Sequence, residues 1–279
     1  MLQAHPGISV SADTEFDDAD AVVIAAPSVL HHELAKRALS NDKHVLVEKP
    51  IALTADDAAE LIEIAERRSR VLMVDHLLEY HPAVVRLKGL VRGGTMGRLY
   101  HLTSQRLNLG VIRSQENALW SLAPHDISVM LFLLDEEPDE VIARGQVCLQ
   151  DDVEDMSYVT LRFPSGTLGL IHTSWLDPVK TRRLTVVGDR CMAVFDDMAE
   201  NKLVLYEHSI DHRGGRYRTT RGDATPVSID ATEPLVAMVQ AFLHSVETGE
   251  PPRSDGRDGL RVVHVLERAH RSMERGRSP

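Results

Sequence analysis

Val22-Val23-Ile24-Ala25-Ala26-Pro27, a helical stretch opening near Ser28, and then His44-Val45-Leu46-Val47-Glu48-Lys49-Pro50 form the stretch of sequence that decides the fold. Two short apolar runs joined by a segment of helical length predict a βαβ unit, because parallel strands are buried on both faces and lack polar alternation. Ligands of open α/β sheets bind at the carboxyl ends of the strands. The residues that follow each run therefore mark the edge where we expect a ligand.

The tripeptide Glu48-Lys49-Pro50, with His31 four residues after Pro27, resembles the Gfo/Idh/MocA family of NAD(P)-dependent oxidoreductases. Asp75–Pro82, after the next apolar run at 71–74, resembles a further family segment. His76, Tyr80 and Pro82 fit its pattern, whereas Asp75 and Glu79 depart from it. The resemblance implies NAD or NADP as cofactor. The residues that it implies as cofactor contacts are Ala26, Pro27, His31, Glu48, Lys49, Pro50 and His76. A helix N-cap at Ser28, with His31 in the first turn, is an alternative or additional role for this segment.

The start of the chain departs from the family. Its members open with a strand, a G-x-G-x-x-G loop and a helix, and this sequence contains no G-x-G-x-x-G. We expect an N-terminally truncated domain that lacks roughly 50 residues, and residues 2–10 to be the end of a helix and a short strand. For the chain as it stands we expect weak or undetectable dinucleotide affinity. The residue that separates NAD from NADP belongs to the absent strand.

The glycines of Arg92–Gly97 predict a turn and a domain boundary, since the segment precedes a strand and does not open a helix. Residues 1–97 are then a partial Rossmann-type parallel sheet, and residues 98–279 an α+β domain with a large, mostly antiparallel open sheet. Thr54 and Asp57 predict a helix start. The expected strands of the second domain are 99–106, 141–149, 156–163, 167–174, 182–187, 192–196 and 203–207, and its helices 119–134, 235–247 and 260–274. The basic, glycine-rich segment 212–221 is expected to be a loop.

Composition limits the classes of function. The chain has 279 residues, a formal net charge of -11 and 43% hydrophobic residues. Such a charge argues against nucleic-acid or anionic-membrane partners, which need clustered Lys and Arg. No segment has the length and apolar character of a membrane span, and Met1–Pro6 lacks the regions of a signal peptide, so we expect a cytoplasmic protein. Cys148 and Cys191 lie in apolar runs and are expected to be reduced core residues.

Two residues suit hydride transfer, which needs a group to take a hydroxyl proton and a cation near the developing oxyanion. Lys49 lies at a strand end, where partial burial would suit an orienting cation or proton relay. His125 lies in a stretch, residues 117–127, that resembles the catalytic segment of the family and implies a general base. The family's acidic residue four positions earlier is Ser121 here. An alternative for His125 is a helix N-terminus with Pro124 in its first turn and Asp126 complementing the dipole.

A polar substrate edge is expected around the same segment. Arg106 and Arg113 could bind a phosphate or carboxylate, although surface salt bridges are an equal alternative. Trp120 could stack on a sugar or belong to the core. The residues assigned to the substrate are Arg106, Asn108, Arg113, Trp120, Ser121 and His125, with Asn117 beside them.

The sequence therefore predicts an oxidoreductase that transfers hydride between a nicotinamide cofactor and a sugar, polyol or nucleotide sugar. We expect Lys49 and His125 to converge on one crevice, and the C-terminal sheet to form a homo-oligomer. His31-His32-Glu33-Leu34-Ala35-Lys36 places a lysine where a zinc protease has its second ligand, and no metal site is assigned. The alternative function is a non-catalytic dehydrogenase remnant that acts as a scaffold subunit.

Overall fold

The computed structural model describes residues 18–276, so the expectation for residues 2–10 lies outside the described part. The chain forms two compact units. Unit 1 combines the chain up to His81 with residues 232–264, and unit 2 combines residues 82–231 with the segment from Val265 onward. The chain passes from unit 1 to unit 2 after His81 and returns to unit 1 at Thr232, so neither change of unit lies at residues 97 and 98, where the sequence predicts a domain boundary.

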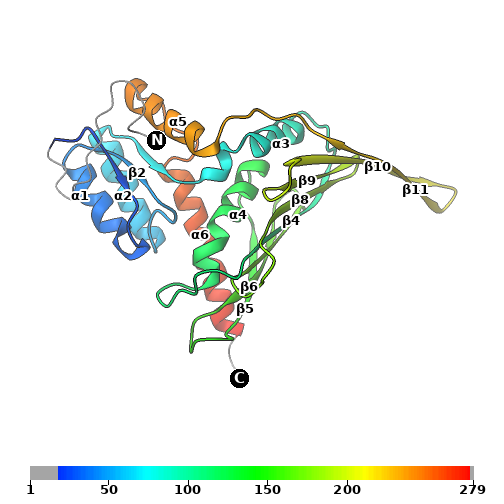
Figure 1. Cartoon of the computed structure of the whole chain (residues 1–279), viewed down its shortest axis with the longest axis horizontal. Coiled ribbons are helices and arrows are strands. Elements are labelled where there is room, and N and C mark those ends of the chain that lie inside the picture. The colour runs from blue at the N-terminus through cyan, green and yellow to red at the C-terminus, as the bar shows by residue number, and fades with distance from the viewer. Residues whose placement is uncertain (1–17, 277–279) are drawn as a thin grey trace. The chain divides into compact units, whose positions relative to one another are not determined.

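Unit 1 is built on a three-stranded sheet (Figure 1). Its strands run in the order β1-β2-β3 and are parallel, which confirms the predicted βαβ unit. The strands are β1 (Ala21–Ile24), β2 (His44–Val47) and β3 (Leu72–Val74), and the helices between them are η2 (Ser28–Leu30), α1 (His31–Ser40) and α2 (Ala55–Arg68). Thr54 Oγ1 accepts a hydrogen bond from the Asp57 backbone N–H at 3.1 Å, so the predicted start of α2 is confirmed.

The returning segment supplies part of the core of unit 1. The short helix η3 (Leu77–Tyr80) follows β3, and α5 (Pro234–Thr248) packs against it. Met238 and Phe242 of α5 are buried with Met73 and Tyr80 in one hydrophobic cluster. The sequence shows that this helix is amphipathic but not which unit buries its apolar side. The boundary therefore could not be placed from local patterns.

Unit 2 contains an eight-stranded sheet in the order β11-β10-β9-β8-β4-β7-β6-β5. The β4–β7 pair is parallel and the other pairs are antiparallel, so the predicted mostly antiparallel sheet is confirmed. Helix α4 packs on β4, β6 and β7. The strands are β4 (Leu99–Leu107), β5 (Glu140–Gln146), β6 (Met156–Arg162), β7 (Leu168–Ser174), β8 (Thr181–Gly188), β9 (Cys191–Asp196), β10 (Leu203–Arg213) and β11 (Arg216–Pro226). The helices are α3 (Pro82–Arg92), α4 (Ala118–Leu134) and α6 (Gly256–Gly276), which begins in unit 1 and ends in unit 2.

Two local predictions for unit 2 are wrong. The expected loop 212–221 is the end of a long β-hairpin, visible in Figure 1, because Gly214 and Gly215 both have positive φ and form the tight turn that joins β10 to β11. Cys148 is exposed, whereas Cys191 is buried as expected. Strand β5 ends at Gln146, and two residues further on the backbone N–H groups of Cys148 and Leu149 donate to Asp155 Oδ2 at 2.7 and 2.8 Å.

The turn before β4 is confirmed at Gly94 and Gly97, which have φ of 71° and 70°. A Cβ on Gly97 would lie 1.7 Å from Asp189 Oδ1, and the same carboxylate accepts from the Arg98 backbone N–H at 3.1 Å. Only glycine fits that position without moving Asp189. Among residues 18–276, no helix has both the length and the apolar character needed to cross a membrane.

Gly97→Ala is expected to lower the free energy of unfolding by roughly 2–3 kcal/mol, because it adds positive-φ strain and a clash with Asp189. Gly94→Ala is the matched control: its φ is also positive, but nothing lies within 4 Å of its Cβ position. We expect it to cost about 1 kcal/mol. Urea unfolding of both variants measures the difference, and equal losses would show that the approach to Asp189 does not matter.

Candidate functional site

The carboxyl edge of the sheet in unit 1 brings together the residues predicted to contact the cofactor. Ile24 pairs with Val47, and Val47 pairs with Val74. The segments that follow these three residues therefore begin side by side: Ala25-Ala26-Pro27, Glu48-Lys49-Pro50 and Asp75-His76. This is the edge where open parallel sheets bind ligands.

His31 joins two of these segments. Its side chain is buried, with Nδ1 2.7 Å from the Pro50 carbonyl oxygen and Nε2 2.8 Å from the Ala26 carbonyl oxygen. Helix α1 begins at His31 after Leu30, and no side chain caps it, so the N-cap expected at Ser28 is wrong. His31 therefore positions Ala26 and Pro50 instead of presenting its ring to a ligand.

Lys49 and its neighbours lie at the end of β2. Glu48 and Lys49 are half-buried, Pro50 is buried, and the Lys49–Pro50 peptide bond is cis. Asp75, the next residue after β3, accepts a hydrogen bond from the Leu77 backbone N–H at 3.1 Å. Burial, and after it the neighbouring Glu48 carboxylate, together raise the pKa of Asp75 to about 6. Sequence reasoning missed Asp75 as a site residue, although its departure from the family pattern was the available signal.

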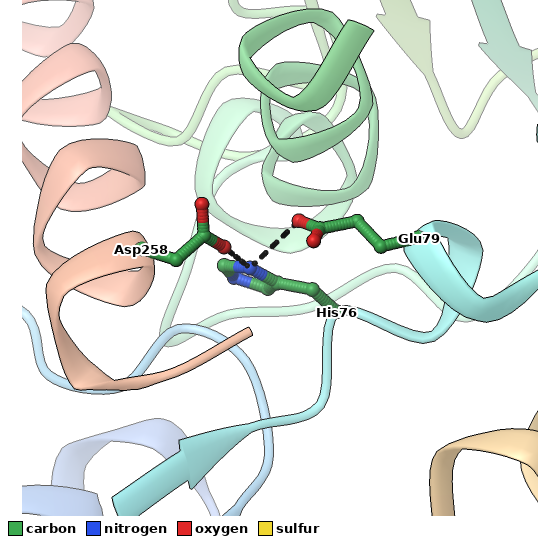
Figure 2. A group of neighbouring side chains, drawn as sticks. All are labelled: His76, Glu79 and Asp258. Carbon is green, nitrogen blue, oxygen red and sulfur yellow. Dashed lines mark hydrogen bonds and ion pairs between the residues drawn. The ribbon is translucent and has the colours of Figure 1, made fainter. Parts of the chain in front are cut away.

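His76 lies next to two carboxylates, as Figure 2 shows. Its Nδ1 is 2.6 Å from Asp258 Oδ2 and 3.4 Å from Glu79 Oε1. His76 and Glu79 are each 1% exposed, and within the described part of the chain neither His76 Nε2 nor Glu79 Oε1 has a hydrogen-bond partner. We call this group the His76–Glu79–Asp258 cluster; the contact predicted between His76 and a cofactor stays a prediction. The sequence could not reveal the cluster because Asp258 is 182 positions away from His76.

The cluster perturbs the titration of its members. Burial alone would lower the pKa of His76, but the Asp258 and Glu79 carboxylates outweigh it and raise that pKa to about 10. Burial raises the pKa of Glu79 to about 7, against the opposing effect of His76. Asp258, despite its burial, has its pKa lowered by the hydrogen bond to His76. A protonated imidazole next to Asp258 carboxylate is the arrangement that these shifts favour.

In unit 2, the Arg106 side chain contacts Asp126. Its Nε and Nη2 donate to the two Asp126 carboxylate oxygens at 2.8 and 3.2 Å, and Ser104 Oγ donates to Asp126 Oδ1 at 2.5 Å. The Arg106 and Asp126 side chains are 11% and 6% exposed. Arg106 and Asp126 therefore form a largely buried bidentate ion pair, and the assignment of Arg106 to the substrate stays a prediction.

Helix α4 carries the predicted catalytic segment of unit 2. It begins at Ala118, where Asn117 Oδ1 accepts from the Trp120 backbone N–H at 3.1 Å. The alternative that placed His125 at a helix N-terminus is wrong, because Pro124 lies inside the helix. His125 is half-buried, and its carbonyl oxygen accepts from Ser128 Oγ at 3.1 Å.

The other residues assigned to substrate differ in their surroundings. Ser121 is buried, and Trp120 meets the His270 ring edge-on at a centroid distance of 6.4 Å. Asn108 is exposed, and Arg113, 54% exposed, forms an ion pair with Glu116 at 2.8 Å. The surface salt bridge weighed as an alternative for Arg113 is therefore present.

Comparison with known proteins finds a family match for each half of the chain. Residues 8–76 match the model of the oxidoreductase family NAD-binding Rossmann fold, and residues 84–194 match the GFO/IDH/MocA C-terminal domain. The myo-inositol 2-dehydrogenase of Thermotoga maritima is 28% identical over 275 residues, which cover 95% of this chain and 80% of that protein. The crystal structure of UDP-N-acetylglucosamine 3-dehydrogenase from Acidithiobacillus ferrooxidans aligns with a TM-score of 0.78 at 28% identity, covering 92% of this chain and 79% of that one.

An inositol dehydrogenase homolog from Azotobacter vinelandii, crystallised with NADH and myo-inositol, shares the fold. Its structure aligns with a TM-score of 0.77 at 20% identity, covering 92% of this chain and 76% of that one.

Glu79→Gln is expected to reduce the pH dependence of stability. The pKa of Glu79 is raised from 4.5 to about 7 in the folded chain, so the folded state holds the extra proton between these values. The wild type therefore loses stability as pH rises from 5 to 7.5, by about 2 kcal/mol relative to Glu79→Gln. Urea unfolding in metal-free buffer at both pH values measures this. The exposed Glu63→Gln is the control, and parallel curves for wild type and Glu79→Gln would contradict the assignment.

Proposed function

Since the chain belongs to the Gfo/Idh/MocA family of NAD(P)-dependent oxidoreductases, we propose that it oxidises or reduces a ring carbon of a sugar, polyol or nucleotide sugar. The observation that carries the proposal is the half-buried Lys49 at the carboxyl end of a parallel strand, next to the segments that His31 holds in place. The named relatives above are dehydrogenases of a polyol and of a nucleotide sugar. None of them favours the non-catalytic alternative.

The residues at the carboxyl edge of the sheet suit the nicotinamide half of NAD or NADP. Lys49 offers a cation there, and the Ala26-Pro27 segment offers a small apolar wall. We assign the cofactor contacts to Ala26, Pro27, Glu48, Lys49 and Pro50, with His31 as the residue that positions them. The bound nicotinamide supplies or takes up the hydride.

Lys49 and His125 take the two roles that remain for the protein. The Lys49 ammonium orients the substrate oxygen and stabilises negative charge on it as the C–H bond forms or breaks. His125 takes the hydroxyl proton during oxidation and returns it during reduction. Arg106 cannot bind an acidic substrate without breaking its largely buried ion pair with Asp126. The substrate residues of this proposal are therefore Ser121, Asn108, Trp120 and the exposed Arg113.

We also propose that the sheet of unit 2 pairs with a second copy of the chain. Its strands β5, β6 and β7 leave Ile142, Tyr158 and Leu170 exposed by 45%, 52% and 38%. The register aligns Ile142 with Thr160 and Thr160 with Leu170, so these side chains share one face of adjacent strands. Contiguous exposed apolar groups of this kind mark interfaces. A cytoplasmic location stays a prediction from the sequence.

The activity is tested with purified protein, with NAD or NADP, and with a panel of myo-inositol, aldoses and UDP-N-acetylglucosamine. The absorbance of the reduced nicotinamide measures turnover. Lys49→Met and His125→Gln are each expected to lower kcat by roughly 10²–10⁴-fold. Lys36→Met and His264→Gln are controls on exposed positions. Turnover that survives in both test variants would end these assignments, and no turnover by the wild type with any substrate would contradict the activity.

Tyr158→Asp and Leu170→Asp are expected to weaken self-association by at least about tenfold, because each buries a charge in the proposed interface. Met198→Asp is the control, since Met198 is 50% exposed in the turn between β9 and β10. Sedimentation velocity over a concentration series gives the mass of the assembly. A monomeric wild type, or equal weakening by all three substitutions, would contradict the interface.

A further inference from the structure

We propose that the His76–Glu79–Asp258 cluster binds one divalent transition-metal ion, for which Zn²⁺ is the probe. His76 lies between β3 and η3, Glu79 lies in η3, and Asp258 lies in the first turn of α6. Their ligand-bearing atoms all lie within 4.8 Å of one another, and the side chains converge as Figure 2 shows. An imidazole nitrogen with two carboxylate oxygens is a donor set that zinc accepts.

The distances in the cluster are close to those of a coordinated ion. Two ligand atoms bound tetrahedrally at about 2.0–2.2 Å from zinc lie about 3.4 Å apart. The distance from His76 Nδ1 to Glu79 Oε1 is already 3.4 Å. Asp258 Oδ2 is now 2.6 Å from the same nitrogen. To reach the tetrahedral spacing it would have to move away from His76 Nδ1 by about 0.8 Å, which a rotation of the Asp258 side chain can supply.

An independent observation also points to a ligand. Glu79 Oε1 is buried, faces His76 Nδ1 and has no hydrogen-bond partner among the described residues. A buried carboxylate oxygen that accepts no hydrogen bond is costly, and a bound cation would satisfy it. Arg261 Nη1 lies 3.6 Å from Asp258 Oδ1, the oxygen opposite the one that faces His76. The arginine therefore leaves Asp258 Oδ2 available to the ion.

The charges of the cluster balance a divalent ion. One neutral imidazole, two carboxylates and a dication sum to zero, which limits the cost of burying the ion. On binding, the ion replaces the proton between His76 and Asp258 and, where Glu79 is protonated, the proton of that carboxyl group as well; both leave to solvent. Three protein ligands leave a fourth coordination position. The ion would join β3, η3 and α6 and so stabilise unit 1.

A second group with the same residue types supplies the control. His32 Nε2 lies 2.7 Å from Glu60 Oε2 and 3.8 Å from Asp57 Oδ1 on the surface of α1 and α2. These side chains are 27–40% exposed, and Lys36 Nζ lies 2.7 Å from the other Glu60 oxygen. The lysine already neutralises that carboxylate, and water solvates the rest. This surface group is therefore not expected to retain an ion.

The test uses the full chain without cofactor or substrate, so it is independent of the proposed activity. Protein stripped with a chelator is incubated with Zn²⁺, passed through a desalting column and measured for metal by inductively coupled plasma mass spectrometry. We expect about one retained equivalent and a higher unfolding temperature than that of the stripped protein. Mn²⁺ and Co²⁺ are run in parallel, and Co²⁺ reports tetrahedral coordination by its visible absorption.

Glu79→Gln and Asp258→Asn keep the side-chain volumes and are each expected to lower the Zn²⁺ affinity by at least about 100-fold and to remove the stabilisation. Glu60→Gln is the control and should retain the ion. Near-ultraviolet circular dichroism confirms that each variant is folded. If the wild type retains no metal and its unfolding temperature does not change, the proposal is wrong. It is equally wrong if Glu60→Gln abolishes binding while folded Glu79→Gln retains it.

Discussion

Parallel pairing of β1, β2 and β3 is the constraint on which unit 1 depends. Parallel strands run in the same direction, so the chain must cross over between them, here in helices, and every strand ends at the same edge of the sheet. Glu48, Asp75 and the Ala25–Pro27 segment consequently begin side by side. His31 then ties Ala26 to Pro50 through both ring nitrogens. The common direction of the strands therefore fixes the edge where a nicotinamide would lie, and the individual side chains only shape it.

Several polar residues that resembled ligand contacts have partners in the interior. Arg106 neutralises Asp126 beneath the large sheet, and Asn117 caps α4 while its Nδ2 donates to Glu154 at 2.7 Å. Burial explains this outcome, because a charged or amide group that leaves water must find partners within the protein. A polar residue on a ligand-binding segment can find its partner either in the protein or in a bound ligand. The residue type alone does not tell which of these two partners it has.

In the His76–Glu79–Asp258 cluster, the need of buried polar groups for partners within the protein is only partly met. His76 and Asp258 satisfy each other, whereas one Glu79 oxygen faces the imidazole at 3.4 Å without a hydrogen bond. The raised pKa of Glu79 reflects the cost of that burial. A proton on Glu79 and a metal ion in the cluster are two ways to remove the same excess of negative charge. The pH dependence of stability and the metal titration examine these two states separately.

Local sequence determined the family, the parallel βαβ unit, the strands β4 to β9 of the large sheet and the position of Lys49 at a strand end, because these depend on short-range periodicity and on a compact motif. Tertiary structure alone decided the return of α5 to unit 1, the pairing of His76 with Asp258 and the burial of Arg106 against Asp126. Each of these joins residues far apart in the chain. The physical reason is that burial and charge pairing depend on which surfaces meet, and no window of neighbouring residues contains that information.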